Sequence, residues 1–547
     1  NGKAAGCSGV SAEMMKPVAL PVAKVLSLIA EIMFCTGLCP EVFKKSNITP
    51  VPKKTNSSDI KDFRPISLTE VPRRIIEKCI ALFLRPYEHR LSPMQGGFRE
   101  HRSTLDQAAV LQQVMMSRHK QRKPTVVAFL DIKAAYDSVD RQLLWECCKR
   151  AGIPDHMIRM LVGMFNYNMS RVVVDGCVGE WFSNSVGLMQ GSSLSPFLYA
   201  LFIDDLPLSL FSHFPSLPLG DSRVNAILYA DDIALISESV DIMQSMLDYC
   251  TEFGKERHFH WGTQKCEVLQ ARIPPASQLL ILQNEPLKIS KTFRYLGLCF
   301  GNKGLDVNAC VDRIGKSMER AAEALSAIGL QPRNYPLHII ASHFRVFVRC
   351  CGEYALAILP LRETHIAKLE RHQYRAIKSL LRIRGRISRV QLLTCMGLET
   401  VRLRYNLVTA KWFHDVILHK GPDFLVRQAL IDFKNMSQPR SVPQFSSSFY
   451  YPSVKNPMMR LDCDQLPVTE FSAQQQWDRD LKSLYRTLKD NCFTKMIADS
   501  RLPNPPSGHS IVKALHSLGI PRNRLRFVVK WMCNHVPYTG HECSICG

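Results

Sequence analysis

Two adjacent acidic residues interrupt a run that is otherwise suited to buried β-strands. Asp231 and Asp232 lie in the segment 226–236, where Ala-Ile-Leu-Tyr-Ala precedes them and Ile-Ala-Leu-Ile follows. A buried carboxylate is costly, so the pair needs a cation, a proton or a turn exposed to water. Because Asp favours turns, the pair taken alone is best explained as a solvated hairpin turn.

A second run of the same kind changes this interpretation. Val-Val-Ala-Phe-Leu at 126–130 delivers Asp131 at the end of a strand-type segment. If the two runs are neighbouring strands of one sheet, Asp131, Asp231 and Asp232 meet. Together they offer oxygen ligands to Mg2+, which takes a few carboxylates plus substrate phosphates. Two such ions clamp the attacking 3′-oxygen and the leaving pyrophosphate in a phosphoryl transfer. The sequence therefore predicts a two-metal site on rigid strands.

Bulk composition narrows the class of partner. The chain has 547 residues, which suggests two to four structural units, and its formal charge of +22 favours polyanions such as nucleic acid. Charge alone fits a merely soluble basic protein equally well. The 19 cysteines do not resemble a disulfide framework and indicate a reducing, intracellular compartment. No secretory signal opens the chain, and the apolar stretch 18–43 is interpreted as an amphipathic helix that packs, not as a membrane span.

Periodicity predicts alternating strands and helices around the carboxylates. Strands are expected at 125–132 and 171–174, helices at 143–149 and 158–165, and two strands joined by a tight polar turn within 224–237. Residues 305–435 are mostly helical by period, with one apolar face that comprises Ile366, Leu369, Ile377 and Leu381. The composition at 437–457 is typical of a linker.

Seven ordered motifs accompany the carboxylates. They are Gly-Lys-Ala-Ala-Gly-Cys-Ser-Gly-Val at 2–10, Asp-Phe-Arg-Pro-Ile-Ser-Leu at 62–68, Gln-Gly-Gly-Phe-Arg-Glu-His-Arg-Ser-Thr at 95–104, Phe-Leu-Asp-Ile-Lys-Ala-Ala-Tyr-Asp-Ser-Val at 129–139, Gly-Leu-Met-Gln-Gly-Ser-Ser-Leu-Ser-Pro at 187–196, Tyr-Ala-Asp-Asp at 229–232 and Phe-Arg-Tyr-Leu-Gly at 293–297. This set resembles reverse transcriptases, most of all those of non-LTR (LINE-type) retrotransposons, and the ordered set is far more specific than any one motif.

The resemblance implies an α+β fold of the right-hand polymerase type. Residues 1–300 would form fingers and a palm with a small antiparallel sheet, residues 301–400 a helical thumb, and residues 401–547 a mostly helical C-terminal region with the linker near 437–457. Asp131 and Asp231 would be metal ligands for two Mg2+ ions, for which Mn2+ can substitute, and Asp232 the third carboxylate.

The resemblance also implies roles around the nucleotide. Tyr136 would be a steric gate, since an aromatic ring under the sugar collides with a 2′-hydroxyl. Arg64 would hold the triphosphate, with Lys53 or Lys54 assisting as point charges. The remaining nucleotide contacts would come from Gln190, Gly191 and Lys265, with Lys265 open to a role as proton donor to pyrophosphate. Its motif departs from the family pattern, since Gly262-Thr-Gln-Lys265 stands where Asn-Pro-x-Lys is usual.

Template and primer contacts follow in the same way. The template would touch Gly97, Phe98 and Arg99, and the primer grip would comprise Phe293, Tyr295, Leu296 and Gly297. The basic run at 362–389 would bind duplex phosphates as part of a thumb, although a solvated helix face is the default for a charge run.

Several acidic and cysteine signals are interpreted as structural. Asp204 and Asp205 resemble a metal-binding pair but are expected at a helix end after the Leu-Ser-Pro motif, and Asp137 and Asp140 are expected to cap or brace the next helix. Residues 541–547 hold His-x-Cys-x-x-Cys, which is half of a zinc site, so a closed zinc site is not expected.

Three functions remain open at this stage. The first is an RNA-directed DNA polymerase that uses an RNA template, a DNA primer or target DNA and dNTPs. It is expected to work by target-primed synthesis, within a ribonucleoprotein of nucleus and cytoplasm and without a membrane. The second is an RNA-directed RNA polymerase, which Tyr136 disfavours. The third is an inactive or domesticated RNA-binding relic. The chain is expected to be a fragment of a longer polyprotein, and no endonuclease is recognisable in it.

Overall fold

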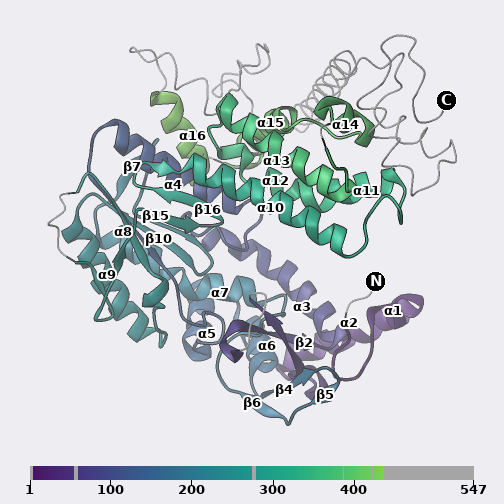
Figure 1. Cartoon of the computed structure of the whole chain (residues 1–547). Helices are drawn as coiled ribbons and strands as arrows, with labels where there is room; N and C mark the ends of the chain where they lie inside the picture. Colours follow the sequence, from purple (N-terminus) through teal and green to yellow (C-terminus); the bar gives the residue numbers. More distant parts are fainter. Residues whose placement is uncertain (1–3, 54–58, 274–278, 386, 422–423, 437–547) are drawn as a thin grey trace. The chain divides into compact units, whose positions relative to one another are not determined.

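The computed structural model describes residues 4–53, 59–273, 279–385, 387–421 and 424–436 (Figure 1). The predicted linker at 437–457 and the zinc half-site at 541–547 lie outside the described residues, as does Lys54. The chain forms two compact units, one built mainly from the residues up to Leu296 and the other mainly from Leu305 onward.

The central sheet of the first unit carries the acidic strands. It has five strands in the order β14 (Lys288–Ile289), β11 (Glu267–Ala271), β3 (Thr125–Leu130), β10 (Asp232–Ser237) and β9 (Ala226–Tyr229). All pairs are antiparallel except that of β11 with β14. All six residues of β3 are buried, as expected for a continuous apolar run in the middle of a sheet. The strand pair predicted within 224–237 is confirmed.

Helices bury this sheet. α9 (Val240–Glu256) places Met243, Met246, Leu247 and Cys250 on one buried face, which is the spacing of an amphipathic helix, and it packs on β10 and β3. α4 (Thr104–Lys120) packs on β9 and β3 and is buried along most of its length.

A second five-stranded sheet lies in the same unit. β2 (Phe63–Thr69), β1 (Lys45–Pro52), β4 (Asn168–Val174) and β5 (Cys177–Val178) follow one another, and β6 (Phe182–Asn184) also pairs with β4. The Pro-rich stretch of β1 can form a strand because β4 pairs only with its first half, up to Ile48. Its later prolines therefore need no ladder partner on that side.

Further helices of the first unit lie between and after these strands in the chain. They are α3 (Val71–Leu84), α5 (Arg141–Arg150), α6 (Asp155–Phe165), α7 (Ser195–Ile203) and α8 (Asp205–His213). The Asp140 side chain accepts hydrogen bonds from the backbone N–H groups of Gln142 and Leu143, so its predicted capping of α5 is confirmed.

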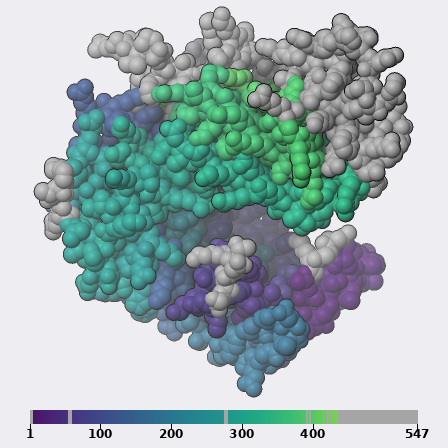
Figure 2. All heavy atoms as spheres, in the orientation of Figure 1, coloured from purple at the N-terminus to yellow at the C-terminus, as the bar shows by residue number. Residues whose placement is uncertain are grey.

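The N-terminal helices are more exposed than the expected packing implies. α2 (Ala19–Thr36) follows the short α1 (Ala12–Met15) and packs against α6, but its buried residues are Leu26 and Met33 alone. Other apolar residues are exposed, among them Leu20 at 70% and Leu28 at 61%. These purple helices form part of the surface seen in Figure 2. By length and composition only, the helical stretch Ala12–Thr36 could cross a membrane, a property shared with core helices and signal sequences.

The second unit is mainly helical, which confirms the helical period predicted for residues 305–435, and its assignment as a thumb stays a prediction. It comprises α10 (Val307–Ala327), α11 (Leu337–His343), α12 (Arg349–Glu353), α13 (Glu363–Leu381), α14 (Arg389–Met396) and α15 (Val401–His419). α13 packs along α10, and the predicted apolar face of Ile366, Leu369, Ile377 and Leu381 is buried. The next helix, α16 (Leu425–Met436), belongs to the first unit up to Phe433.

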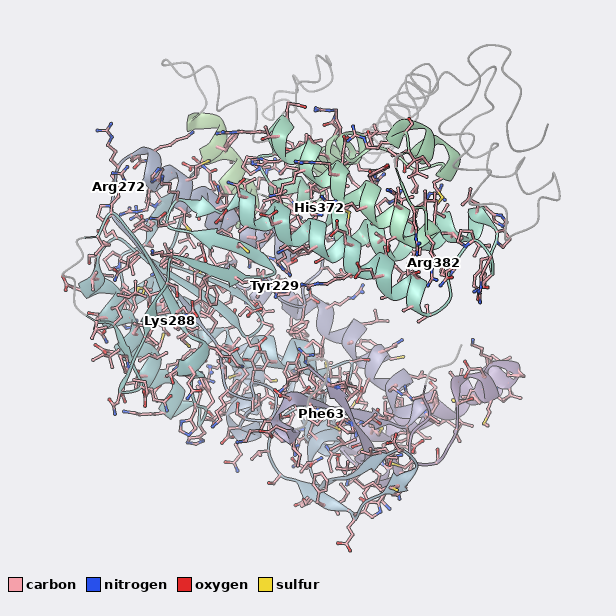
Figure 3. The ribbon with its side chains drawn as sticks, in the orientation of Figure 1. Phe63, Tyr229, Arg272, Lys288, His372 and Arg382 are labelled. Atoms are coloured by element: carbon pink, nitrogen blue, oxygen red, sulfur yellow. The ribbon has the colours of Figure 1, made fainter. Side chains whose placement is uncertain are left out.

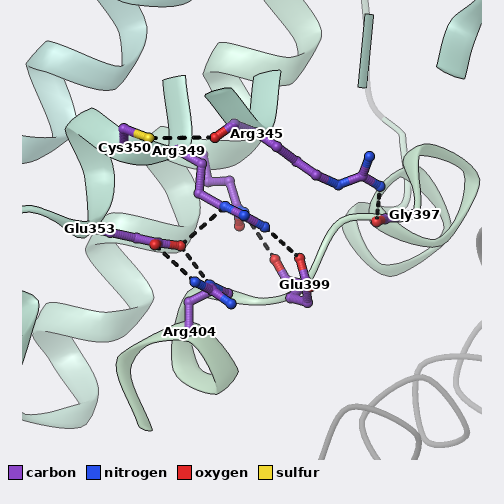
Figure 4. A network of polar contacts seen from close by, with 8 residues as sticks. Arg345, Arg349, Cys350, Glu353, Gly397, Glu399 and Arg404 are labelled. Carbon is purple, nitrogen blue, oxygen red and sulfur yellow. Dashed lines mark hydrogen bonds and ion pairs between the residues drawn. The ribbon is translucent and has the colours of Figure 1, made fainter. Parts of the chain in front are cut away.

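Ion pairs hold the helices of the second unit together (Figure 4). Glu353 accepts hydrogen bonds from Arg404 at 2.6 and 2.9 Å, and Arg349 lies 3.3 Å from it and 3.1 Å from Glu399. Because both Arg349 and the carboxylates are at most a quarter exposed, the network is screened less than a surface pair. It ties α12 to the start of α15.

The remaining strands are short. β7 (Leu217–Leu219) and β8 (Ser222–Val224) form one hairpin, and β12 (Ile281–Leu282) and β13 (Glu285–Pro286) form another. β15 (Thr292–Tyr295), β16 (Leu298–Gly301) and β17 (Gly304–Leu305) complete the order.

Candidate active site

The acidic turn joins β9 to β10. Tyr229, labelled in Figure 3, ends β9 and pairs with Asp232 across a two-residue loop, Ala230 and Asp231. Ala230 has a φ of 59°, which is unusual for a residue with a side chain. The turn therefore holds the acids in a conformation that neighbouring contacts must stabilise.

Strand register brings the third acid beside this turn. β10 pairs with β3 so that Ile233 faces Leu130, which places Asp232 opposite Asp131 one residue further along. The two apolar runs are thus neighbours in one sheet, as the prediction required.

The negative charges of neighbouring acids act on Asp231 and Asp232, and a lysine contacts Asp131. Lys265 donates to the Asp131 carboxylate at 2.8 Å. Burial and the Asp131 charge raise the pKa of Asp231, while Lys265 and Arg64 oppose this. Partial loss of hydration, followed by the charges of Asp231 and Asp131, raises the pKa of Asp232 to about 6. A bound cation would relieve this mutual repulsion.

The carboxylates can supply only some of the ligands that a divalent cation needs. Within the described ranges, no group of three or more His, Cys, Asp or Glu side chains is arranged to hold an ion. The predicted three-carboxylate site is therefore not preformed. A physical reason lies in the backbone, because successive residues at the start of a strand direct their side chains to opposite faces. Mg2+-type sites commonly combine one or two carboxylates with substrate phosphates and water, which this arrangement permits.

A buried glutamine holds the acidic turn, and sequence reasoning did not identify it. The side-chain oxygen of Gln95, a fully buried residue, accepts hydrogen bonds from the backbone N–H of Ala230 at 3.0 Å and of Gly97 at 2.8 Å. Gln107 donates from its side chain to the backbone oxygens of Leu228 and Met94. The available signal was the position of Gln95 inside the motif at 95–104.

Gly97 and Arg99 have internal partners in this structure. A Cβ on Gly97 would lie 2.3 Å from the Ala230 nitrogen, so glycine is needed for the close approach to the turn. The Arg99 guanidinium donates to the backbone oxygens of Ser92, Gln95 and Glu88. Phe98, with a φ of 60° and 44% exposure, is the predicted template residue whose side chain is most exposed.

The predicted phosphate-binding residues lie on the β1–β2 pair. Arg64 is exposed on β2 opposite Val51, and its positive charge is one of the influences that oppose the raised pKa of Asp231. The Lys53 ammonium donates to the Lys61 backbone oxygen at 2.7 Å.

The predicted gate and the loop at 187–196 are tied together. The Tyr136 backbone oxygen accepts from Leu188 N–H at 2.7 Å, and the Gln190 backbone oxygen accepts from Ser67 N–H at 2.8 Å. A Cβ on Gly191, whose φ is 139°, would meet the Ser67 oxygen at 2.5 Å. Gly191 is therefore needed for approach to β2. The loop bridges the Tyr136 segment and the strand that bears Arg64.

Tyr136 itself lies beside the acids. Burial, followed by the charge of Asp231, raises the pKa of its hydroxyl. Its ring is half-buried and stacks on that of Tyr199.

The predicted primer-grip residues partly pack inward. Phe293 stacks on Phe129 of β3 with ring centroids 4.2 Å apart, and the Tyr295 hydroxyl donates to the Ile227 oxygen at 3.4 Å. Leu296 and Gly297 have φ values of 45° and 79°, which form a tight turn after β15. Tyr295 thus braces the sheet that carries the acids.

The second acid pair is structural, as predicted. Asp204 accepts a hydrogen bond from Ser92 N–H at 2.8 Å. Asp205 forms ion pairs with Arg150 and Arg257. Asp137, expected to cap or brace a helix, instead lies 3.5 Å from the Gln190 amide.

A divalent cation is expected to raise the melting temperature more at about pH 7.5 than at about pH 5. The pKa of Asp232 is raised to about 6, so its proton stabilises the folded chain at low pH and this contribution is lost as the pH rises through that value. At higher pH a cation can replace the proton. Thermal unfolding with and without Mg2+ at both pH values measures the effect. Asp232→Asn should reduce the difference, and an equal cation effect at both pH values in the unmodified chain would contradict the expectation.

Comparison with known proteins agrees with this geometry. Residues 51–300 match the family model described as reverse transcriptase (RNA-dependent DNA polymerase). The retrovirus-related Pol polyprotein of the type-2 element R2DM of Drosophila melanogaster is 25% identical over 58% of this chain and 31% of its own length. The RNA-directed DNA polymerase of the mobile element jockey, also of Drosophila melanogaster, is 24% identical over 66% of this chain and 40% of its own length.

The alignments cover only part of this chain and only part of each relative. The type-1 element R2 polyprotein of Nasonia vitripennis is 24% identical over 51% of this chain, which spans only 28% of that relative. Apo telomerase from Candida Tropicalis aligns over 75% of this chain and 74% of its own with 12% identity and a TM-score of 0.39, too low to carry a conclusion. The matched domain and the retrotransposon relatives agree with the acidic strand pair: residues 51–300 match the reverse transcriptase family, and the chain is similar to the polyproteins and polymerases of retrotransposable elements.

Proposed function

We propose that this chain is an RNA-directed DNA polymerase that adds deoxyribonucleotides to a primer 3′-hydroxyl with the help of two Mg2+ ions, for which Mn2+ can substitute. The observation that carries the proposal is the strand register, which sets Asp232 opposite Asp131 next to the turn that bears Asp231. These acids lie within a domain that matches reverse transcriptases, and they can supply part of the oxygen ligands that divalent ions need.

The mechanism assigns separate tasks to the residues around the acids. Bound divalent ions would activate the 3′-oxygen and neutralise the leaving pyrophosphate, and Asp131 and Asp231 would hold them. Arg64 would bind the triphosphate, since its guanidinium is exposed and its charge acts on Asp231. Lys265 pairs with Asp131. With Asp131 engaged in holding an ion, the Lys265 ammonium would be available to donate a proton to pyrophosphate.

Substrates and setting are inferred from charge and from relatives. The charge of +22 suits an RNA template and a DNA primer or target. Since relatives are named as retrotransposon polyproteins, we infer target-primed synthesis from a nicked chromosomal strand by a ribonucleoprotein of nucleus and cytoplasm. The chain spans less than half of these relatives, so other activities can reside outside it.

Primer extension tests the proposal and separates the alternatives. The purified chain, an annealed RNA template and DNA primer, and either Mg2+ or Mn2+ are supplied with dNTPs or rNTPs. DNA product supports the proposal, and a preference for rNTPs indicates an RNA polymerase. Template binding without any product, with both metal ions, would instead support an RNA-binding relic.

Replacing Tyr136 by Val is expected to relax discrimination against ribonucleotides by roughly 10- to 100-fold, since contacts of one to three kcal/mol set such selectivity. The smaller side chain leaves room for the 2′-hydroxyl. Steady-state kcat/KM for one dNTP and the matching rNTP measures the ratio. Tyr167→Val, at a site 80% exposed, is the matched control. Unchanged discrimination in Tyr136→Val would remove the gate assignment.

A further inference from the structure

A second tyrosine lies directly against the proposed gate. The rings of Tyr136 and Tyr199 are nearly parallel, with centroids 5.2 Å apart and an angle of 7° between their planes. Tyr199 is 1% exposed, whereas Tyr136 remains half-buried. One ring of the pair is therefore fixed in the core and the other is open to a ligand.

The inner ring belongs to a rigidly held helix. α7 begins at Ser195, and seven of its nine residues are buried, so Tyr199 has little freedom to move. The turn before it is anchored by Ser193 N–H, which donates to the buried Glu77 carboxylate at 3.0 Å. The Tyr136 segment has the opposite character, because it lies in a turn after β3 rather than in a helix or strand. Stacking on Tyr199 of α7 can therefore fix the Tyr136 ring, because the turn that bears Tyr136 is not held by a helix or strand.

The packing of Tyr199 depends on its ring and not on its hydroxyl. It is buried and has no hydrogen-bond partner among the described residues. Buried tyrosine hydroxyls usually have one, and leaving a polar group unpaired is unfavourable. The aromatic ring, which supplies the stack, is therefore the part whose removal should matter.

We propose that Tyr199 is a positioning residue for nucleotide selection, whose ring holds the Tyr136 ring in the orientation that collides with a 2′-hydroxyl. This inference rests on the proposed function of the site as a DNA polymerase. Tyr199 is almost completely buried, so it acts through Tyr136 and not by contact with the nucleotide.

Replacement of the Tyr199 ring tests the inference. Tyr199→Leu and Tyr199→Met, whose unbranched side chain can adapt to the space that the ring leaves, are expected to reduce the ratio of kcat/KM for a dNTP to that for the matching rNTP by about 3- to 10-fold, the range expected from loss of an aromatic stack. Tyr199→Phe keeps the ring and should keep the ratio. The control Phe202→Leu removes a ring that is 2% exposed from the same helix, and it should lower stability without changing the ratio.

A double substitution separates positioning from general damage. In a Tyr136→Val background the gate is already gone, so Tyr199→Met should cause no further loss of discrimination. A merely structural role would lower activity with dNTPs and rNTPs alike and leave the ratio constant in every background.

The outcomes distinguish the two hypotheses. A wild-type chain that makes DNA, together with an unchanged ratio in Tyr199→Met, overturns the positioning role and leaves the polymerase proposal intact. An effect of Tyr199→Met that persists in the Tyr136→Val background also overturns it. A wild-type chain that makes no DNA removes the polymerase proposal and the inference with it. If Tyr199→Leu does not fold, Tyr199→Met decides.

Discussion

Replacing Asp231 by Asn is expected to lower primer extension at least about a thousandfold while template binding stays within about twofold of wild type. Asn retains the shape of the side chain but removes the negative charge that a divalent ion requires. Asp231 occupies a two-residue turn between paired strands, so the substitution can be accommodated without disturbing β9 or β10. Single-nucleotide extension in Mg2+ and filter binding of the RNA template measure the two quantities.

The second acid pair provides a matched control. Asp204 and Asp205 are adjacent in the sequence, like Asp231 and Asp232, but Asp205 forms ion pairs with Arg150 and Arg257. Asp205→Asn should therefore lower stability slightly and leave nucleotide addition within a fewfold of wild type. Equal activity of Asp231→Asn and wild type would refute the assignment of the acidic turn as the catalytic site.

Replacing Arg73 by Ala is expected to destabilise the first unit by about 3–5 kcal/mol, the usual consequence of leaving one member of a buried ion pair alone. Arg73 and Glu77 are both 0% exposed and lie 2.8 Å apart on α3. Arg73 also donates to the Phe43 backbone oxygen, and Glu77 accepts from Ser193 N–H. The pair thus connects the helical turn before β1 to the loop before α7, and its loss leaves a buried charge uncompensated. The midpoint of urea unfolding measures the change.

Two further variants make this test specific. Lys78→Ala changes an exposed basic residue of the same helix and should alter stability by no more than about 0.5 kcal/mol. Replacing Arg73 by Met and Glu77 by Leu together removes both charges, so it should restore part of the loss seen in Arg73→Ala. A small effect of Arg73→Ala would contradict the expectation, since it would mean that other groups compensate the buried Glu77 charge.

Much of the sheet that carries the acids could be predicted because its signals are local. The apolar runs ending at Asp131 and flanking Asp231 have the length and composition of buried strands, and the structure has β3, β10 and β9 there. Helices α5 and α6 and the apolar face of α13 follow from their period in the same way. The family resemblance added residue roles that no period could supply.

Other predictions stay predictions or are met only in part, because they depend on distant neighbours. Arg99 has the charge of a template-binding residue, yet its donors are directed to three backbone oxygens. Gly191 was expected over the nucleotide, and the structure shows why glycine is needed against Ser67. The apolar helix α2 was expected to pack, but only Leu26 and Met33 are buried.

By itself, the sequence determined that strands would carry Asp131 and Asp231, because hydrophobic period and carboxylate placement are written in consecutive residues. Only the tertiary structure decided the register that puts Asp232 opposite Asp131, the buried Gln95 that holds the acidic turn, and the Tyr199 ring beneath Tyr136. Each of these is a contact between residues far apart in the chain. Such contacts are set by the packing of whole strands and helices, which a local pattern does not specify.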